Sequence, residues 1–238
     1  MRLRNAVQER GLAGTALQCL KLPLAPLLRT ELAERWTRDS SAWIFDRRFD
    51  VDTSGFIQKP IPGELGEFSN PYLGTPAGHF KRILRSLNIR CEEFSFVDFG
   101  SGKGRVVLLA AAFPFRSVLG VEFSRELHDI AERNIVRYRG PRACANVKSI
   151  YMDAGEFQIP DGKLLLYFYN PFDPPVLEKV VENIGNSVRQ KPRESVIAYL
   201  NPKSRAVFDR APFLEIISDR QWFVLYKTKV PNLKDSRI

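Results

Sequence analysis

The sequence is poor in the residues that bind metals and form disulfides. Its 238 residues include three cysteines, Cys19, Cys91 and Cys144, and two histidines, His79 and His128. An odd and sparse set of cysteines gives no disulfide framework and indicates a reducing compartment. No Cys or His residues have the spacing of a zinc site. We therefore expect no metal and a cytoplasmic location.

A dense basic run is also lacking, although the formal net charge is +9. The tightest basic group is Arg133, Arg137, Arg139 and Arg142. A net positive charge can favour binding to nucleic acid or to an anionic membrane surface. Because the charge is spread along the chain, we interpret it as a solvated surface and expect no nucleic-acid partner. The alternative, in which the four arginines form an anion-facing rim, stays open.

No long apolar segment is uninterrupted. Residues 11–29 are the most apolar, but they contain Lys21, Pro23 and Pro26, whereas a membrane-spanning helix needs about 20 mainly apolar residues. We expect residues 1–38 to be helical and to pack on the rest of the chain. The alternatives are peripheral contact with a membrane surface and a targeting peptide. Residues 39–75 contain Gly, Pro, Ser and Asp throughout and predict an irregular connection.

Part of that connection imitates the start of a calcium-binding loop. Asp50, Asp52, Ser54 and Gly55 stand at loop positions 1, 3, 5 and 6, but position 12, which should be a bidentate Glu, is Ile61. We interpret this stretch as a turn that does not bind calcium.

From residue 76 onward, apolar strands alternate with amphipathic helices, and we divide the chain into an extension (1–75) and a domain (76–238). Alternation of this kind predicts an α/β fold with a parallel sheet and helices on both faces. In such sheets, ligands bind outside the carboxyl ends of the strands. The predicted strands are 94–99, 117–123, 147–153, 163–170 and 195–201, followed by a hairpin at 214–219 and 221–227. One predicted helix begins at Pro76, and the others span 104–113, 125–137, 175–189 and 203–210.

The first strand–helix junction, FVDFGSGKGR (96–105), is therefore the predicted site. A P-loop would need a glycine where Val97 stands and a hydroxyl residue where Gly104 follows Lys103. A dinucleotide-binding fingerprint would need a third glycine where Arg105 stands. Neither phosphate-binding motif fits, and we expect Lys103 to face solvent in the first turn of the helix.

Three acids at the ends of successive strands restrict the ligand more than the glycines do. Asp98 precedes Gly100 and would repel a pyrophosphate, but it suits an ammonium or sulfonium group. Glu122 ends the second strand, where an acid can accept both hydroxyls of a ribose. Asp153 ends the third strand, where it could meet the amine of an adenine. S-adenosylmethionine carries all three groups. The alternative for each acid alone is a helix cap or a turn.

The pattern D-x-G-x-G-x-G after a strand, followed by the acid in GVEFS (120–124), resembles the class I S-adenosylmethionine-dependent methyltransferases. The resemblance implies a Rossmann-like, seven-stranded sheet, mostly parallel with a reversed last strand, and S-adenosyl-L-methionine as the cofactor. It also implies that Asp98 holds the amino-acid end of the cofactor or orients the loop, and that Glu122 binds the ribose and Asp153 the adenine. Backbone contacts to the cofactor are implied for Gly100, Ser101 and Gly102.

Two further stretches resemble parts of related enzymes. YFYNPFD (167–173) is similar to an Asn-Pro-Pro-aromatic motif of amino-methylating relatives, with one proline fewer, and implies Asn170 and Phe172 as acceptor-site residues. NPYLGTP (70–76) resembles the cofactor lid of non-SET lysine methyltransferases, which implies that Tyr72 and Thr75 close over the methionine moiety. The alternatives are an Asn-Pro turn and a helix start capped by Thr75.

The resulting hypothesis is a methyltransferase that methylates nitrogen in an amine or amide acceptor, such as a protein lysine. The acceptor class stays open, because fold does not fix function. A nicotinamide-dependent oxidoreductase and a non-catalytic methyltransferase-like binding module are the alternatives.

Overall fold

The structure is a computed structural model that describes residues 42–57, 72–73 and 75–229. The helix predicted over residues 1–38, and with it the membrane contact, lies outside the described residues and stays a prediction.

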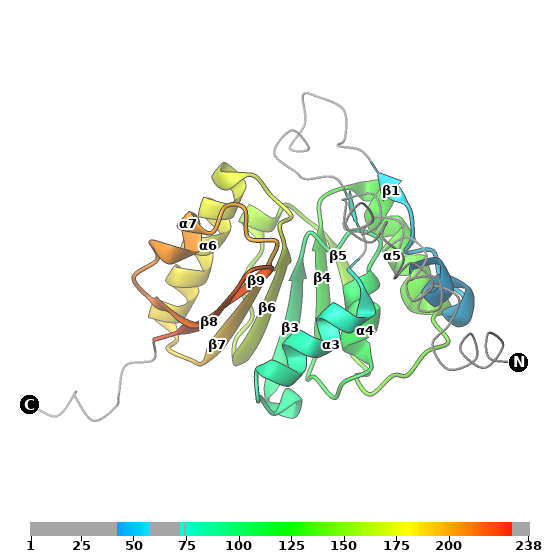
Figure 1. The fold of residues 1–238 in the computed structure, drawn as a ribbon, viewed down its shortest axis with the longest axis horizontal. Helices are drawn as coiled ribbons and strands as arrows, with labels where there is room; N and C mark the ends of the chain where they lie inside the picture. The colour runs from blue at the N-terminus through cyan, green and yellow to red at the C-terminus, as the bar shows by residue number, and fades with distance from the viewer. Residues whose placement is uncertain (1–41, 58–71, 74, 230–238) are drawn as a thin grey trace, which may run out of the picture.

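A seven-stranded sheet forms the centre of the molecule (Figure 1). Its strand order is β5-β4-β3-β6-β7-β9-β8; β3 to β7 are parallel, and β9 runs antiparallel to both of its neighbours. This mostly parallel sheet with a reversed last strand is the Rossmann-like methyltransferase fold that the sequence predicted. The strands are β3 (Phe94–Phe99), β4 (Val118–Glu122), β5 (Val147–Tyr151), β6 (Lys163–Tyr169), β7 (Ser195–Leu200), β8 (Leu214–Arg220) and β9 (Phe223–Thr228).

Helices cover both faces of the sheet (Figure 1), and the side-chain alternation within each strand explains why. In β6, Tyr167 belongs to the core under α3 and α4, whereas Phe168 belongs to the core under α6 and α7. Successive strand residues point to opposite faces, so a strand that is apolar throughout needs a helical layer on each side. The helices are α3 (Ala77–Ser86), α4 (Arg105–Ala111), α5 (Arg125–Arg137), α6 (Pro174–Gln190) and α7 (Ala206–Asp209).

A short helix and a strand pair contradict the expectation of an irregular connection over residues 39–75. Residues 42–49 are helical, and β1 (Phe56–Ile57) pairs with β2 (Tyr72–Leu73). The buried Ala42, Phe45 and Asp46 fall at helical spacing, and this face packs on the domain because Phe45 and Phe49 contact the ring of Tyr138. The surrounding turn residues hid this short pattern. The domain boundary at residue 76 stays a prediction.

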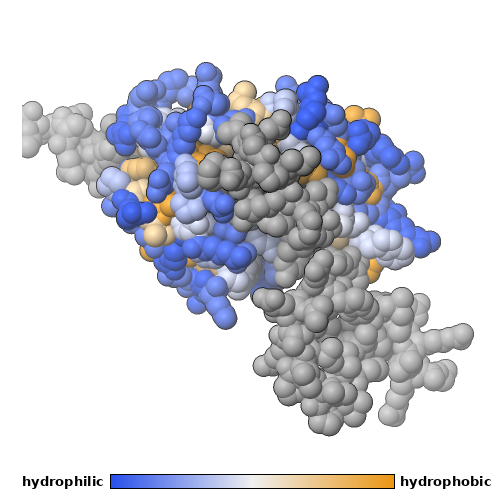
Figure 2. Space-filling model, turned by 90° about the horizontal axis from the view of Figure 1, so that it is seen from above, coloured by the Kyte–Doolittle hydropathy of each residue, from blue (hydrophilic) through white to orange (hydrophobic). Residues whose placement is uncertain are grey.

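Seen from above, the coloured surface is mainly hydrophilic around its outside, with scattered hydrophobic patches (Figure 2). Met152 is one of the few large apolar side chains exposed near the edge at which the parallel strands end, at 39%. Within the described residues, no helix has the length and apolar character needed to cross a membrane.

Candidate functional site

The sheet register brings the predicted acids to one edge. Asp98 in β3 lies opposite Gly120 in β4, and Glu122 is two residues further along that strand. Glu122 lies opposite Tyr151 in β5, and Asp153 follows two residues later. Because the carboxyl ends of parallel strands meet at one edge, the three acids line the end of the sheet beside the switch point between β3 and β6.

The loop after β3 is held in a conformation that requires glycine. Gly100, Gly102 and Gly104 have φ values of 72°, 55° and 80°, in the left-handed region that side chains disfavour. A Cβ on Gly100 would also lie 2.5 Å from Cβ of Pro171. The glycine spacing therefore serves a tight turn that packs closely against the end of β6.

This loop does not offer a ring of free N–H groups to a phosphate. The N–H groups of Gly100 and Ser101 both donate to the carbonyl of Val121. Gly104 donates to the carbonyl of Ser101, and Gly102 donates to Oε2 of Glu122 at 2.7 Å. Phosphate-binding loops work by aiming such N–H groups at the ligand, and these four N–H groups are already used within the protein.

Asp98 is a buried carboxyl without a hydrogen-bond donor among the described residues. It is 4% exposed, and its neighbours include the carboxylate of Glu122 and the ring of Tyr167. Burial raises the pKa of Asp98 well above its ordinary value, and the negative charge of Glu122 raises it further. A buried carboxyl of this kind would gain from a cationic partner.

Glu122 is also buried but makes hydrogen bonds. Its Oε2 accepts from Gly102 N–H, and its Oε1 accepts from Ser124 N–H at 2.9 Å. Burial raises the pKa of Glu122, while these donors act in the opposite direction. Glu122 thus fixes the glycine-rich loop. A carboxylate has about four acceptor sites, so it can accept one more hydrogen bond beside those from Gly102, Ser124 and Phe123.

Lys103 contradicts the expectation of a solvent-facing side chain. It is 8% exposed, and its Nζ donates to Oδ1 of Asp52 at 2.7 Å and to the carbonyl of Ser54 at 2.9 Å. Asp52 is thereby an ion-pair partner within the turn that imitates a calcium loop. The expectation failed because the two residues are 51 positions apart in the sequence.

Arg105 and Tyr167 are site neighbours that the sequence reasoning missed. Arg105 is 2% exposed, and its Nε donates to the carbonyl of Thr75 at 2.8 Å. Tyr167 lies opposite Asp98 in the sheet, and its hydroxyl is 3.5 Å from Oγ1 of Thr75. The position of Tyr167, on the strand that pairs with β3, was the one available signal.

The two predicted lid residues differ in what the structure describes. Thr75 is buried beside Tyr167, but it does not cap α3, whose N-cap is Pro76 and has no side-chain cap. For Tyr72 only the backbone is described, as part of β2. Contact of both residues with a cofactor stays a prediction.

Asp153 is half-buried and takes the capping role that was its alternative. Its Oδ1 accepts from Gly155 N–H at 2.8 Å, at the start of a short 3-10 helix (Ala154–Glu156). This bond engages one carboxylate oxygen and fixes the side chain at the end of β5. A role in binding adenine stays a prediction.

The residues after β6 form a strained turn beside the glycine-rich loop. Asn170 has φ 45°, is 6% exposed and accepts a hydrogen bond on Oδ1 from the Tyr199 hydroxyl at 3.1 Å. Phe172 is 5% exposed, and its ring lies 3.6 Å from a Cβ placed on Gly100. Both residues therefore lie at the edge where β3 ends, beside the loop that follows Asp98, and the Phe172 ring supports that loop.

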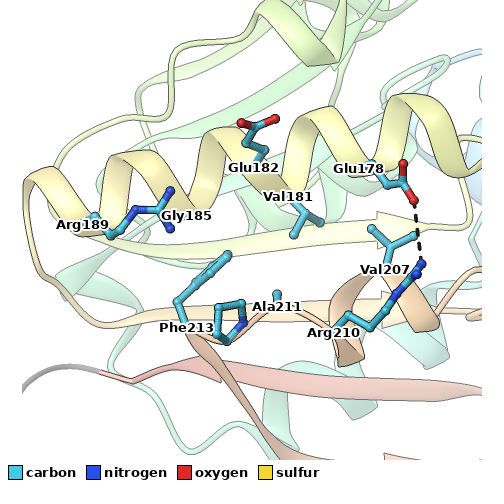
Figure 3. Close-up of a pocket in the computed structure, with 10 residues that line it drawn as sticks. Glu178, Val181, Glu182, Gly185, Arg189, Val207, Arg210, Ala211 and Phe213 are labelled. Atoms are coloured by element: carbon cyan, nitrogen blue, oxygen red, sulfur yellow. Dashed lines mark ion pairs between the residues drawn. The ribbon is translucent and has the colours of Figure 1, made fainter.

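A groove of about 310 Å³ lies elsewhere, between α6 and the segment that joins α7 to β8 (Figure 3). An ion pair between Glu178 and Arg210, at 3.7 Å, crosses it. None of the predicted site residues lines it. Among the described residues, no three His, Cys, Asp or Glu side chains are grouped as metal ligands.

No family model and no curated protein matches this sequence. Solved methyltransferase structures are similar to it. The RNA methyltransferase from Salinibacter ruber, solved with S-adenosyl-L-homocysteine, is 21% identical, with 67% of this chain and 95% of that chain covered and a TM-score of 0.46. The ribosomal protein L11 methylase from Lactobacillus delbrueckii subsp. bulgaricus is 10% identical, with coverages of 70% and 83% and a TM-score of 0.47. A putative RNA methyltransferase from Pyrococcus horikoshii is 17% identical, with coverages of 67% and 85% and a TM-score of 0.48.

Proposed function

We propose that this chain is an enzyme that transfers a methyl group from S-adenosyl-L-methionine to a nitrogen of an amine or amide acceptor. The observation that carries the proposal is the Asp98 carboxyl, 4% exposed and without a donor among the described residues. It lies at a loop in which the N–H groups of all three glycines and of Ser101 are already bonded. A cationic ligand would pair with the Asp98 carboxylate. A phosphate would be repelled by this buried acid and would lack hydrogen bonds from the bonded N–H groups of the loop.

The residues present fit this cofactor. Asp98 would attract its ammonium and sulfonium end, and Glu122 would accept a hydrogen bond from a ribose hydroxyl at its remaining acceptor site. Asp153 would accept from the adenine amine. The cofactor supplies an electrophilic methyl group on a positively charged sulfur.

Asn170 is the residue that we assign to the acceptor. Its Oδ1 already accepts from the Tyr199 hydroxyl, which holds the carboxamide in place, and a carbonyl oxygen can accept a second hydrogen bond. If the N–H of an acceptor amine donates to this oxygen, the protein orients the lone pair on the amine nitrogen. In an in-line displacement such alignment supplies a large part of the rate. Phe172 would act by supporting the loop that faces the reaction.

The decisive experiment is isothermal titration of the purified chain with S-adenosyl-L-homocysteine. We expect saturable binding to wild type and none to Asp98→Ala. Absence of binding by folded wild-type protein would overturn the proposal. The oxidoreductase alternative is tested in parallel by mixing the chain with NADH. A change in NADH fluorescence would support that alternative.

The acceptor class is tested separately with cofactor labelled in the methyl group. The wild-type chain is incubated with a cell lysate that is then divided into protein, nucleic acid and small molecules. Label in protein or small amines is expected, and label in nucleic acid would replace our acceptor class by a nucleobase. Binding of cofactor without any transfer would favour the non-catalytic binding module.

A further inference from the structure

We propose that Lys103 and Arg105 are positioning residues that fasten residues 42–55 to the glycine-rich loop, so that this anchored segment and the cofactor stabilise each other's binding. The inference rests on the proposed function, because it concerns the same loop. It assigns a role to two basic residues whose neighbours in the sequence gave no reason to expect one.

Lys103 connects the loop itself to the anchored segment. It stands between Gly102 and Gly104, so its backbone is part of the turn that follows Asp98. Its side chain is 10% exposed and pairs with Asp52, whose side chain is 63% exposed. A lysine this buried needs partners for its charge, and the partners found among the described residues belong to the anchored segment: Asp52 Oδ1 and the Ser54 carbonyl.

Arg105 connects the start of α4 to Thr53 and to Thr75, two residues that are far apart in the sequence. Its Nη1 donates to Oγ1 of Thr53 at 2.8 Å, and its Nε donates to the carbonyl of Thr75 at 2.8 Å. Its guanidinium stacks over Phe45, with Cζ 4.5 Å from the ring centroid. One side chain thus places Thr75 against Tyr167, the strand neighbour of Asp98.

The anchored segment also has hydrogen bonds of its own. The Asp46 carboxylate accepts from the N–H and hydroxyl of Thr53 and from the N–H of Ser54, at 2.6 to 2.8 Å. Asn134 in α5 joins the two partners, because its Nδ2 donates to the carbonyls of Asp52 and Lys103 at 2.7 and 2.9 Å. Lys103, Arg105 and Asn134 thus each bond the anchored segment, so the segment can hold the loop in place.

Glycine at three alternate positions, each with a left-handed backbone, makes the loop conformationally permissive, so its surroundings determine the conformation that it adopts. The anchored segment is one such determinant, and cofactor bound against the loop would be the other. By thermodynamic reciprocity, if the attachment of the anchored segment to the loop raises the affinity for cofactor, bound cofactor stabilises that attachment by the same factor. Cofactor affinity should therefore depend on Asp52, a residue whose exposed carboxylate belongs to a different part of the chain.

The test is a double-mutant cycle with Lys103→Met and Asp52→Asn, measured as affinity for S-adenosyl-L-homocysteine by calorimetry. We expect each single variant to bind about 5- to 20-fold more weakly, and the double variant to bind no more weakly than the weaker single one, since contacting residues are not additive. Lys148→Met, at an exposed lysine of β5, is the matched control with wild-type affinity. Asp52→Asn keeps the test valid if Lys103→Met does not fold.

Amide exchange gives a readout that a purely structural role would not move. Cofactor analogue should slow exchange in residues 42–55 of wild type, and much less in Asp52→Asn. If the variants lose melting temperature but keep wild-type affinity, the pair is merely structural and the inference is wrong, while the proposed function stands. If wild type itself does not bind, the proposed function fails first.

Discussion

The N–H of Gly102 donates to Oε2 of Glu122 at 2.7 Å, so an acid at the end of β4 fixes the loop that follows β3. The same carboxylate accepts from Ser124 at the start of α5. Glu122 thus joins the strand–helix junctions that follow β3 and β4, at the carboxyl edge of the sheet. Any ligand that also bonds Glu122 contacts a group whose orientation is already set by the fold.

Glu122→Gln tests this double role. The amide has one acceptor oxygen and presents N–H groups where the second oxygen stood, so it faces Gly102 or Ser124 with the wrong polarity. We expect affinity for S-adenosyl-L-homocysteine to fall at least about tenfold, because hydrogen bonds to a charged group contribute about 1.5–3 kcal/mol. Glu126→Gln, on the exposed face of α5, should bind as wild type does. Equal affinities for the two variants would remove Glu122 from the cofactor site.

Asp98→Asn should stabilise the ligand-free protein at neutral pH while removing cofactor binding. The pKa of Asp98 is raised by burial and by the charge of Glu122, so the folded state holds this proton more tightly than the unfolded state does. Its contribution to stability is therefore present below the unfolded pKa of about 4 and is lost as pH rises through the folded pKa. The neutral amide avoids that loss.

Thermal unfolding of both proteins from pH 4 to pH 8 measures the difference. We expect a higher melting temperature for Asp98→Asn at pH 7, by about 2–4 °C for each kcal/mol recovered, and similar values for both proteins near pH 4. A variant that is less stable than wild type at pH 7 would contradict the charge argument. Calorimetry with the cofactor analogue then confirms whether stability and binding oppose each other at this residue.

The sequence predicted the sheet because its apolar strands are buried on both faces and its glycines and acids follow local rules. The boundaries of β3 and α5 match the predicted ranges 94–99 and 125–137. What it could not predict were contacts between distant segments, such as Lys103 with Asp52. A basic residue in a glycine-rich loop is solvated by default, and only the tertiary placement of residues 42–55 makes its burial possible. The short helix over 42–49 was missed because tertiary packing, and not propensity, stabilises it.

Gly100→Ala should destabilise the protein, because two constraints act at one position. Its φ of 72° disfavours any side chain, and a Cβ would lie 2.5 Å from Cβ of Pro171. A left-handed conformation alone costs about 1–2 kcal/mol, and the clash adds to it. Gly78→Ala in α3 is the matched control, since nothing lies within 4 Å of its Cβ position and alanine favours helix by about 1 kcal/mol. Urea unfolding should therefore shift in opposite directions for the two variants.

Asn170→Gly should separate methyl transfer from cofactor binding. Glycine accepts the φ of 45° at this position and removes only the carboxamide. Asn201→Gly is a close control, because Asn201 also has φ 45°, is also followed by a proline and directly follows the neighbouring strand β7. We expect both variants to bind S-adenosyl-L-homocysteine as wild type does. Transfer of labelled methyl groups should fall about 100-fold in Asn170→Gly, the cost typical of losing one positioned hydrogen-bonding group, and should persist in Asn201→Gly. Full activity in Asn170→Gly would move the acceptor site away from the end of β6.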